Sequence, residues 1–159
     1  MSVTDLDVLV QIQREGAIVA LGHVFPQERY PFPVDVVRRR WEEEVADPGI
    51  DCFAVLGPYE AVAGFAATRA NQFLHFGTAV ETWGSGLAGR AHDAVLRHLV
   101  THGHRGAWLR VFERNERARR FYERRGWRRT GQSSRSEFPP YPILLSYQVA
   151  LTGPQASRT

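Results

Sequence analysis

The stretch LRVFERNERARRFYERRGW, residues 109–127, joins a strand-like apolar run to a short amphipathic helix. Asn115 suits the N-cap of that helix, because its side-chain oxygen can accept a hydrogen bond from the first turn. Ala118, Phe121 and Tyr122 then fall on one face at helical spacing. The sequence therefore predicts a strand that leads into a helix with an inward aromatic face.

Arginines fill the opposite face of this predicted helix, interleaved with Glu116 and Glu123. They are Arg114, Arg117, Arg119, Arg120, Arg124 and Arg125. Opposite charges at helical spacing form intrahelical ion pairs, so a solvated face accounts for them without a polynucleotide. An arginine-rich nucleic-acid binder is the alternative, and duplex DNA binding with a steep salt dependence would identify it.

Tyr122 is the residue of this helix that can take part in a reaction. We interpret Phe121 as a core aromatic, whereas a buried tyrosine hydroxyl needs a hydrogen-bonding partner. A phenol with an ordinary pKa of about 10 is protonated at neutral pH and can give up that proton. Tyr122 is therefore a candidate general acid.

A second motif, VETWGSGLAGRAHDAVL at residues 80–96, has the pattern strand, glycine loop, helix. Glycine lets a backbone approach a ligand closely, and the first helical turn has N–H groups without intrahelical acceptors. Such donors, at the positive end of the helix dipole, favour a diphosphate. The motif is neither a Walker A loop nor the dinucleotide fingerprint, and a structural turn would also explain it.

Two helices are predicted near the amino terminus, one after a capping-box pattern at Thr4–Asp7 and the other from Asp35. Residues 23–35 between them carry three prolines and are expected to be irregular. The run RRRWEEE, residues 38–44, is interpreted as a solvated face of paired charges. The inward positions of the second helix are Val37, Trp41 and Val45.

Strand-like runs dominate the remainder. DCFAVL and AVAGFAAT flank the turn signal GPYE and predict an antiparallel hairpin, with FLHFGTAV as a third strand. A helix from Leu87 keeps its apolar spacing as far as Gly103, and WRRTGQ and ILLSYQVAL are the closing strands. The order α-α-β-β-β-α-β-α-β-β predicts one mixed α/β domain over residues 1–151, with a polar tail at 152–159.

The composition is that of an ordinary globular protein, with 159 residues, a net charge of +3 and 43% hydrophobic residues. No apolar run approaches the ~20 residues that cross a bilayer, so no membrane partner is expected. All basic residues are arginine, which excludes a lysine Schiff base. The single cysteine, Cys52, is interpreted as a buried hydrophobe, and without an intramolecular disulfide a cytoplasmic location is expected.

In this order and at this separation, the two motifs resemble those of the GNAT N-acetyltransferase superfamily. The pyrophosphate loop of that family, Gln/Arg-x-x-Gly-x-Gly/Ala, is matched from Trp83 to Ala88. Its later pattern, Asn-x-x-Ala-x-x-Phe-Tyr-x-x-x-Gly-Phe, is matched from Asn115 to Trp127. The resemblance implies a mixed, mostly antiparallel sheet with splayed central strands, and an enzyme that acetylates an amine with acetyl-CoA.

The resemblance also implies roles for individual residues. Backbone groups near Thr78 and Val80 would bind the pantetheine arm, Asn115 would hold its end, and Tyr122 would protonate the leaving thiolate. Backbone N–H groups of the splayed strand would stabilise negative charge on the carbonyl oxygen. Some of the arginines would meet the 3′-phosphate of the cofactor. The implied cofactor-binding residues of the glycine loop are Trp83, Gly84, Ser85, Gly86, Leu87 and Ala88.

The amine must lose a proton before it attacks. Glu81, at the end of the third predicted strand, and Glu28, in the proline-containing segment, are candidate bases, with His75 behind them. Each of the three also suits an ordinary surface or strand position, and a chain of water molecules is the alternative.

No metal is expected, although His98 and His102 have a spacing that metal sites use. No carboxylate or cysteine lies nearby in the sequence, and Gly103 ends the helix just after the pair. A solvated helix end, where cationic histidine suits the dipole, explains the pair.

The chain departs from the family pattern at three places. Trp83 stands where the family favours Gln or Arg, and Gly77 and Thr78 are unusual in a strand, which predicts a wider cleft or a bent strand. The first strand common in the family is missing or very short. The sheet edge that this leaves would suit a partner in a homodimer.

The acceptor is expected to be a small primary amine. The segments VFPQERYPFPV and SEFPPYPIL would shape its site, and their aromatic and proline content indicates a partly apolar pocket wall. An amine of a protein is the alternative acceptor. A third hypothesis is an acyl-CoA-binding module without turnover.

Overall fold

The computed structural model describes residues 1–153, and within them it confirms the predicted order of helices and strands. The predicted polar tail, residues 152–159, lies mostly outside the described residues. The helices are α1 (Leu6–Leu21), α2 (Val34–Ala46), α3 (Leu87–Thr101) and α4 (Glu116–Arg124). The strands are β1 (Ile50–Leu56), β2 (Val62–Arg69), β3 (Gln72–Thr78), β4 (Gly106–Phe112), β5 (Arg128–Arg135) and β6 (Ile143–Ala150).

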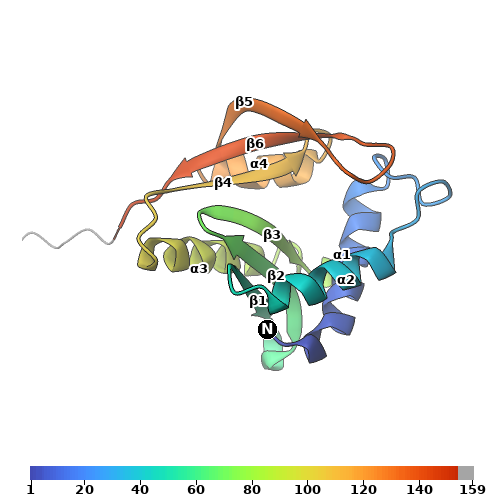
Figure 1. The fold of residues 1–159 in the computed structure, drawn as a ribbon, viewed down its shortest axis with the longest axis horizontal. Helices are drawn as coiled ribbons and strands as arrows, with labels where there is room; N and C mark the ends of the chain where they lie inside the picture. Colours follow the sequence, from blue (N-terminus) through green and yellow to red (C-terminus); the bar gives the residue numbers. More distant parts are fainter. Residues whose placement is uncertain (154–159) are drawn as a thin grey trace, which may run out of the picture.

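Six strands form one mixed sheet in the order β1-β2-β3-β4-β6-β5. All neighbours are antiparallel except β3 and β4, which run parallel and pair only between Gln72 and Trp108. Figure 1 shows the consequence, because β4 and β6 diverge from the green β2–β3 pair. The predicted splaying of the central strands is therefore confirmed.

A β-bulge in β3 accounts for this divergence. Ala67 pairs with His75 and Thr68 with Phe73, so Leu74 is an extra residue on β3. A bulge of this kind bends its strand and increases the local twist. After Gln72, β3 therefore leaves the direction of β4, and the two strands separate.

Helices cover both faces of the sheet. Phe65 and Ala66 are consecutive residues of β2, and they lie in two separate core clusters because successive side chains point to opposite faces. On one face Phe65 packs with Leu9 of α1 and Trp41 of α2. On the other face Ala66 belongs with Leu99 of α3 and with residues of β4 and β6.

The charged run of α2 is partly buried, which corrects one prediction. Arg38 pairs with Glu42 at helical spacing, as a solvated face requires. Glu44, however, is only 8% exposed, and it accepts a hydrogen bond from His75 Nε2 at 2.8 Å. The sequence pattern missed this pair because its partner lies 31 residues away on β3.

Two element boundaries and the burial of Cys52 also differ from the predictions. The capping box is at Ser2 and Asp5, not Thr4–Asp7, and a 3-10 turn at Val3–Asp5 precedes α1. The third strand ends at Thr78 because Val80–Thr82 forms a 3-10 turn. Cys52 is half-buried, and desolvation raises the pKa of its thiol to about 11, so it stays protonated at neutral pH.

The first strand of the family was expected to be missing or very short. Within residues 1–153 the first strand is β1, and it follows both α1 and α2. No helix in this part of the chain is both long and apolar enough to cross a bilayer. The single-domain boundary at residue 151 and the homodimer stay predictions.

A buried histidine that the sequence analysis did not single out joins the two motif helices. His92 of α3 is 1% exposed, and its Nε2 accepts a hydrogen bond from the indole of Trp127 at 3.0 Å. The proton is therefore on Nδ1, which donates to Asp93 at 2.8 Å. Burial lowers the pKa of His92, so the imidazole is neutral at pH 7. Trp127 replaces the phenylalanine of the family motif, and His92 supplies the acceptor that its N–H needs.

We expect His92→Leu and Trp127→Phe each to lower the free energy of unfolding by about 1–3 kcal/mol, because each leaves a buried polar group without its partner. The double variant should be more stable than the sum of the two losses predicts, by about 0.5–3 kcal/mol. Urea unfolding of the four proteins measures the coupling. Strictly additive losses would show that the hydrogen bond does not stabilise the fold.

Candidate functional site

The glycine turn between η3 (Val80–Thr82) and α3 follows the end of β3. Gly84 and Gly86 adopt φ values of +81° and +86°, which only glycine reaches without strain. The Ser85 N–H donates to the Thr82 carbonyl at 3.1 Å, and the Leu87 N–H to the Ser85 hydroxyl at 3.3 Å. Among the described residues, the N–H groups of Gly84, Gly86 and Ala88 have no acceptor. These three donors are available to an anion.

Arg125 brings a positive charge to the first turn of α3. Its guanidinium lies directly over Gly89, so any side chain at that position would displace it. It also stacks on Phe121, with the guanidinium carbon 4.3 Å from the ring centre. Its Nε is buried without a hydrogen-bonding partner. The prediction of a solvated position for Arg125 is therefore wrong, because Arg125 lies just past the end of α4 and packs toward α3.

An unpaired guanidinium at the amino end of a helix is electrostatically unfavourable, because the helix end is itself positive. A phosphate group bound there would satisfy both the guanidinium and the N–H donors of the turn. The donor set thus fits a diphosphate better than a purely structural turn does.

Trp83, in the same turn, contacts both α1 and α4. Its indole N–H donates to the Thr78 carbonyl at 3.0 Å, and the ring lies beside Gly16 of α1. On the other side Arg117 of α4 stacks on it, 3.6 Å from the ring centre. Desolvation against this ring lowers the pKa of Arg117, although the residue as a whole is exposed, as predicted. The Thr78 carbonyl, expected to bind pantetheine, is therefore held by Trp83.

Asn115 and Tyr122 are positioned by α4. The Asn115 side chain accepts a hydrogen bond from the Ala118 N–H at 3.2 Å, which confirms it as the N-cap. Tyr122 packs against Trp127, with 5.8 Å between the ring centres, and against His92. Burial raises the pKa of Tyr122, which keeps its hydroxyl protonated. That hydroxyl makes no hydrogen bond to residues 1–153, so its proton is free for a ligand.

The three candidate bases lie in different surroundings. Glu81 is exposed on η3 and lines a cavity of about 410 Å³. Glu28 is exposed in the segment between α1 and α2 and does not line that cavity. His75 is bound to Glu44 and packs on Trp41.

The cavity beside Glu81 is acidic. Asp7 and Glu15, one helical stripe of α1, face the same space, although Asp7 also pairs with Arg38. Val8, Ile12 and Val62 supply apolar walls, and Gln11 completes the lining. Three carboxylates beside these apolar side chains suit a small molecule with several ammonium groups.

Neither of the two segments expected to shape the acceptor site lines the cavity beside Glu81. In the segment after α1, His23 Nε2 lies 2.7 Å from the Arg114 carbonyl, and Phe25 packs edge-on against Phe112. In the β5–β6 connection, Glu137 pairs with Arg40, which also stacks on Phe138.

Sequence reasoning missed Arg125, Glu44 and the acidic face of α1, and only the spacing of Asp7, Gln11 and Glu15 was a usable signal. A model of the acetyltransferase (GNAT) family matches residues 9–127. No curated protein sequence matches the chain.

Among solved structures, a spermidine N-acetyltransferase from Vibrio cholerae, in complex with CoA and spermine, superposes with a TM-score of 0.70. It is 17% identical, over 95% of this chain and 92% of that one. An N-acetyltransferase from Staphylococcus aureus Mu50 is 15% identical over 96% of each chain, with a TM-score of 0.71. At sequence identities this low, the similarity to these two structures shows a shared fold and nothing more.

Proposed function

The chain belongs to the acetyltransferase (GNAT) family, and we propose that it transfers an acetyl group from acetyl-CoA to a primary amine of a small cationic molecule. The observation that carries the cofactor assignment is the glycine turn with its free N–H groups beside the unpaired Arg125. The acidic cavity at Glu81 carries the assignment of a cationic acceptor. The spermine complex of a similarly folded enzyme supports the same class of acceptor.

In the proposed reaction the amine nitrogen attacks the thioester carbon, and the C–S bond breaks as the tetrahedral intermediate collapses. The Tyr122 hydroxyl gives its proton to the leaving thiolate, and the raised pKa of Tyr122 favours the protonated form that this step needs. Glu81 takes the proton that the amine loses, directly or through water. Glu28 is the other candidate for this base.

The diphosphate of the cofactor would occupy the N–H groups of Gly84, Gly86 and Ala88, with Arg125 against it. Ser85 and Leu87 would shape the turn, because their N–H groups already have acceptors. The pantetheine arm would use backbone groups at Thr78 and Val80 and the Asn115 side chain. We propose that the Trp83 indole leaves the Thr78 carbonyl when the arm binds.

A thiol-release assay across amine classes tests the function. With acetyl-CoA, we expect the fastest release with a linear polyamine such as spermidine, because Asp7, Glu15 and Glu81 attract its ammonium groups. A peptide with a free amino terminus should react more slowly. Faster reaction of the peptide would favour a protein acceptor, and acetyl-CoA binding without release for any amine would favour a non-catalytic module.

Tyr122→Phe should lower kcat by about two to four powers of ten if proton donation limits the rate. Affinity for acetyl-CoA should change little, because the ring and its packing stay. Tyr59→Phe is the matched control, since Tyr59 is fully exposed in the β1–β2 turn. Unchanged turnover in the Tyr122 variant would remove the general-acid role.

Glu81→Gln and Glu15→Gln separate the base from the binding pocket. Both carboxylates line the cavity, so both variants should raise the KM for a polyamine. Only Glu81→Gln should also lower kcat, by about 10²-fold or more, as loss of a general base does. Steady-state kinetics with saturating acetyl-CoA would show this, and a kcat loss in Glu28→Gln instead would transfer the role to Glu28.

A further inference from the structure

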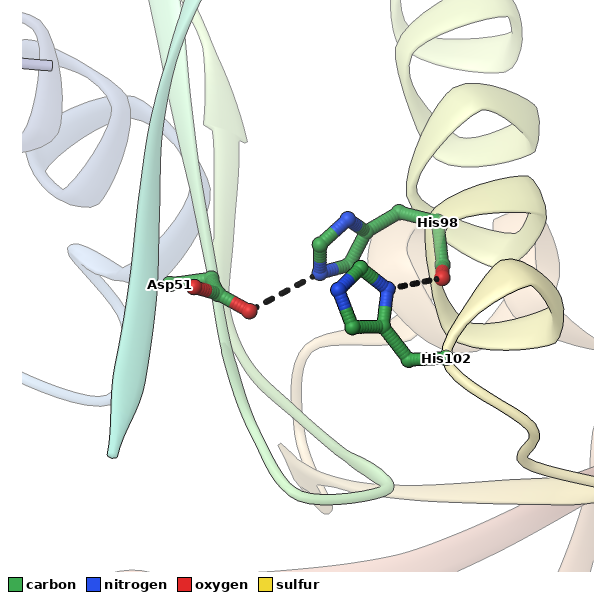
Figure 2. A group of neighbouring side chains, drawn as sticks. All are labelled: Asp51, His98 and His102. Atoms are coloured by element: carbon green, nitrogen blue, oxygen red, sulfur yellow. Dashed lines mark hydrogen bonds and ion pairs between the residues drawn. The ribbon is translucent and has the colours of Figure 1, made fainter. Parts of the chain in front are cut away.

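The last turn of α3 and the start of β1 bring two histidines and a carboxylate together (Figure 2). His98 Nε2 lies 2.9 Å from Asp51 Oδ2, and the His98 and His102 rings are 4.1 Å apart. One ligand atom from each residue lies within 4.8 Å of the others. We propose that Asp51, His98 and His102 bind one divalent transition-metal ion of the Zn²⁺ class.

The expectation of no metal rested on the lack of a carboxylate near the histidines in sequence. Asp51 precedes His98 by 47 residues, and the packing of β1 beside α3 supplies it. Phe53, two residues along β1 on the same face, contacts the His98 ring edge-on at 4.9 Å. The strand thus both presents the carboxylate and orients the first imidazole.

The hydrogen bonds already prepare His102 as a ligand. Its Nδ1 lies 2.8 Å from the His98 carbonyl, which can only accept, so Nδ1 carries the proton. The Nε2 lone pair is therefore free, and in Figure 2 this nitrogen lies on the side of the ring toward Asp51. A backbone carbonyl that fixes the tautomer of a histidine is the usual outer partner of a metal ligand.

The electrostatic setting favours a cation. His102 is the C-cap of α3, and the carboxyl end of a helix carries partial negative charge. Asp51 adds a full negative charge. Two imidazoles with one carboxylate select a transition metal such as Zn²⁺ over Ca²⁺ or Mg²⁺, which prefer oxygen ligands.

Bonds of about 2.0–2.2 Å would require the three side chains to draw together slightly, and water would complete the coordination. Asp51 and His102 are exposed and His98 is half-buried, so their side chains can rotate without disturbing the core. The site lies at the opposite end of the 15-residue α3 from the glycine turn, about 20 Å away. The bound ion would therefore link β1 to α3 and stabilise their packing.

Calorimetric titration of the metal-free chain with Zn²⁺ should give one equivalent bound. His102→Ala and Asp51→Asn should each weaken binding by about tenfold or more, since even the loss of an outer partner has this effect. His104→Ala, which removes a neighbouring histidine outside the cluster, should bind as the parent does. Equal binding by His102→Ala, or no binding by the parent, would overturn the site.

Nitrogen NMR of the unaltered chain gives a second test that needs no variant. Zn²⁺ should shift the Nε2 signals of His98 and His102, while His102 Nδ1 stays protonated and His104 is unaffected. Shifts at His104 or His23 in place of the pair would identify adventitious surface binding and contradict the proposal. Because this readout involves no acetyl transfer, its result is independent of the proposed enzymatic function.

Discussion

The single parallel pairing between β3 and β4 is the constraint on which the rest of the site depends. Only Gln72 and Trp108 join these strands, and the extra residue at Leu74 turns β3 away immediately afterwards. An unbroken ladder would have used the backbone groups at the end of β3 in pairing with β4. Because the strands part, the end of β3 leads into a glycine turn whose N–H groups remain without protein acceptors.

A sheet with so weak a central pairing needs other contacts to hold its two sides in place. The aromatic cluster around His92 joins α3 to α4 and to Trp127 just before β5, and its hydrogen bond fixes the relative orientation of the two motif helices. On the other side, Phe25 contacts Phe112 and thereby links the segment after α1 to the end of β4. Both contacts therefore join elements from the two sides of the weakly paired sheet.

The sequence predicted what depends on local spacing and missed what depends on tertiary contact. The order of elements, the Asn115 cap and the left-handed glycines follow from residues within a few positions of each other. The prediction that Arg125 is solvated was wrong, because the periodicity of α4 carries no information about its packing against α3. The Glu44–His75 pair and the carboxylate beside His98 were missed for the same reason, since each contact joins residues more than thirty positions apart.

The use of arginine in place of lysine has a structural consequence beside the glycine turn. Arg125 stacks on Phe121 and Arg117 on Trp83, and within residues 1–153 neither guanidinium has a carboxylate partner. A planar guanidinium can rest on an aromatic ring in this way, whereas an ammonium group is more strongly hydrated. Elsewhere Arg38, Arg40 and Arg120 are neutralised by ion pairs. Stacking therefore keeps positive charge available beside the glycine turn, and Arg117 stays charged at neutral pH although desolvation lowers its pKa.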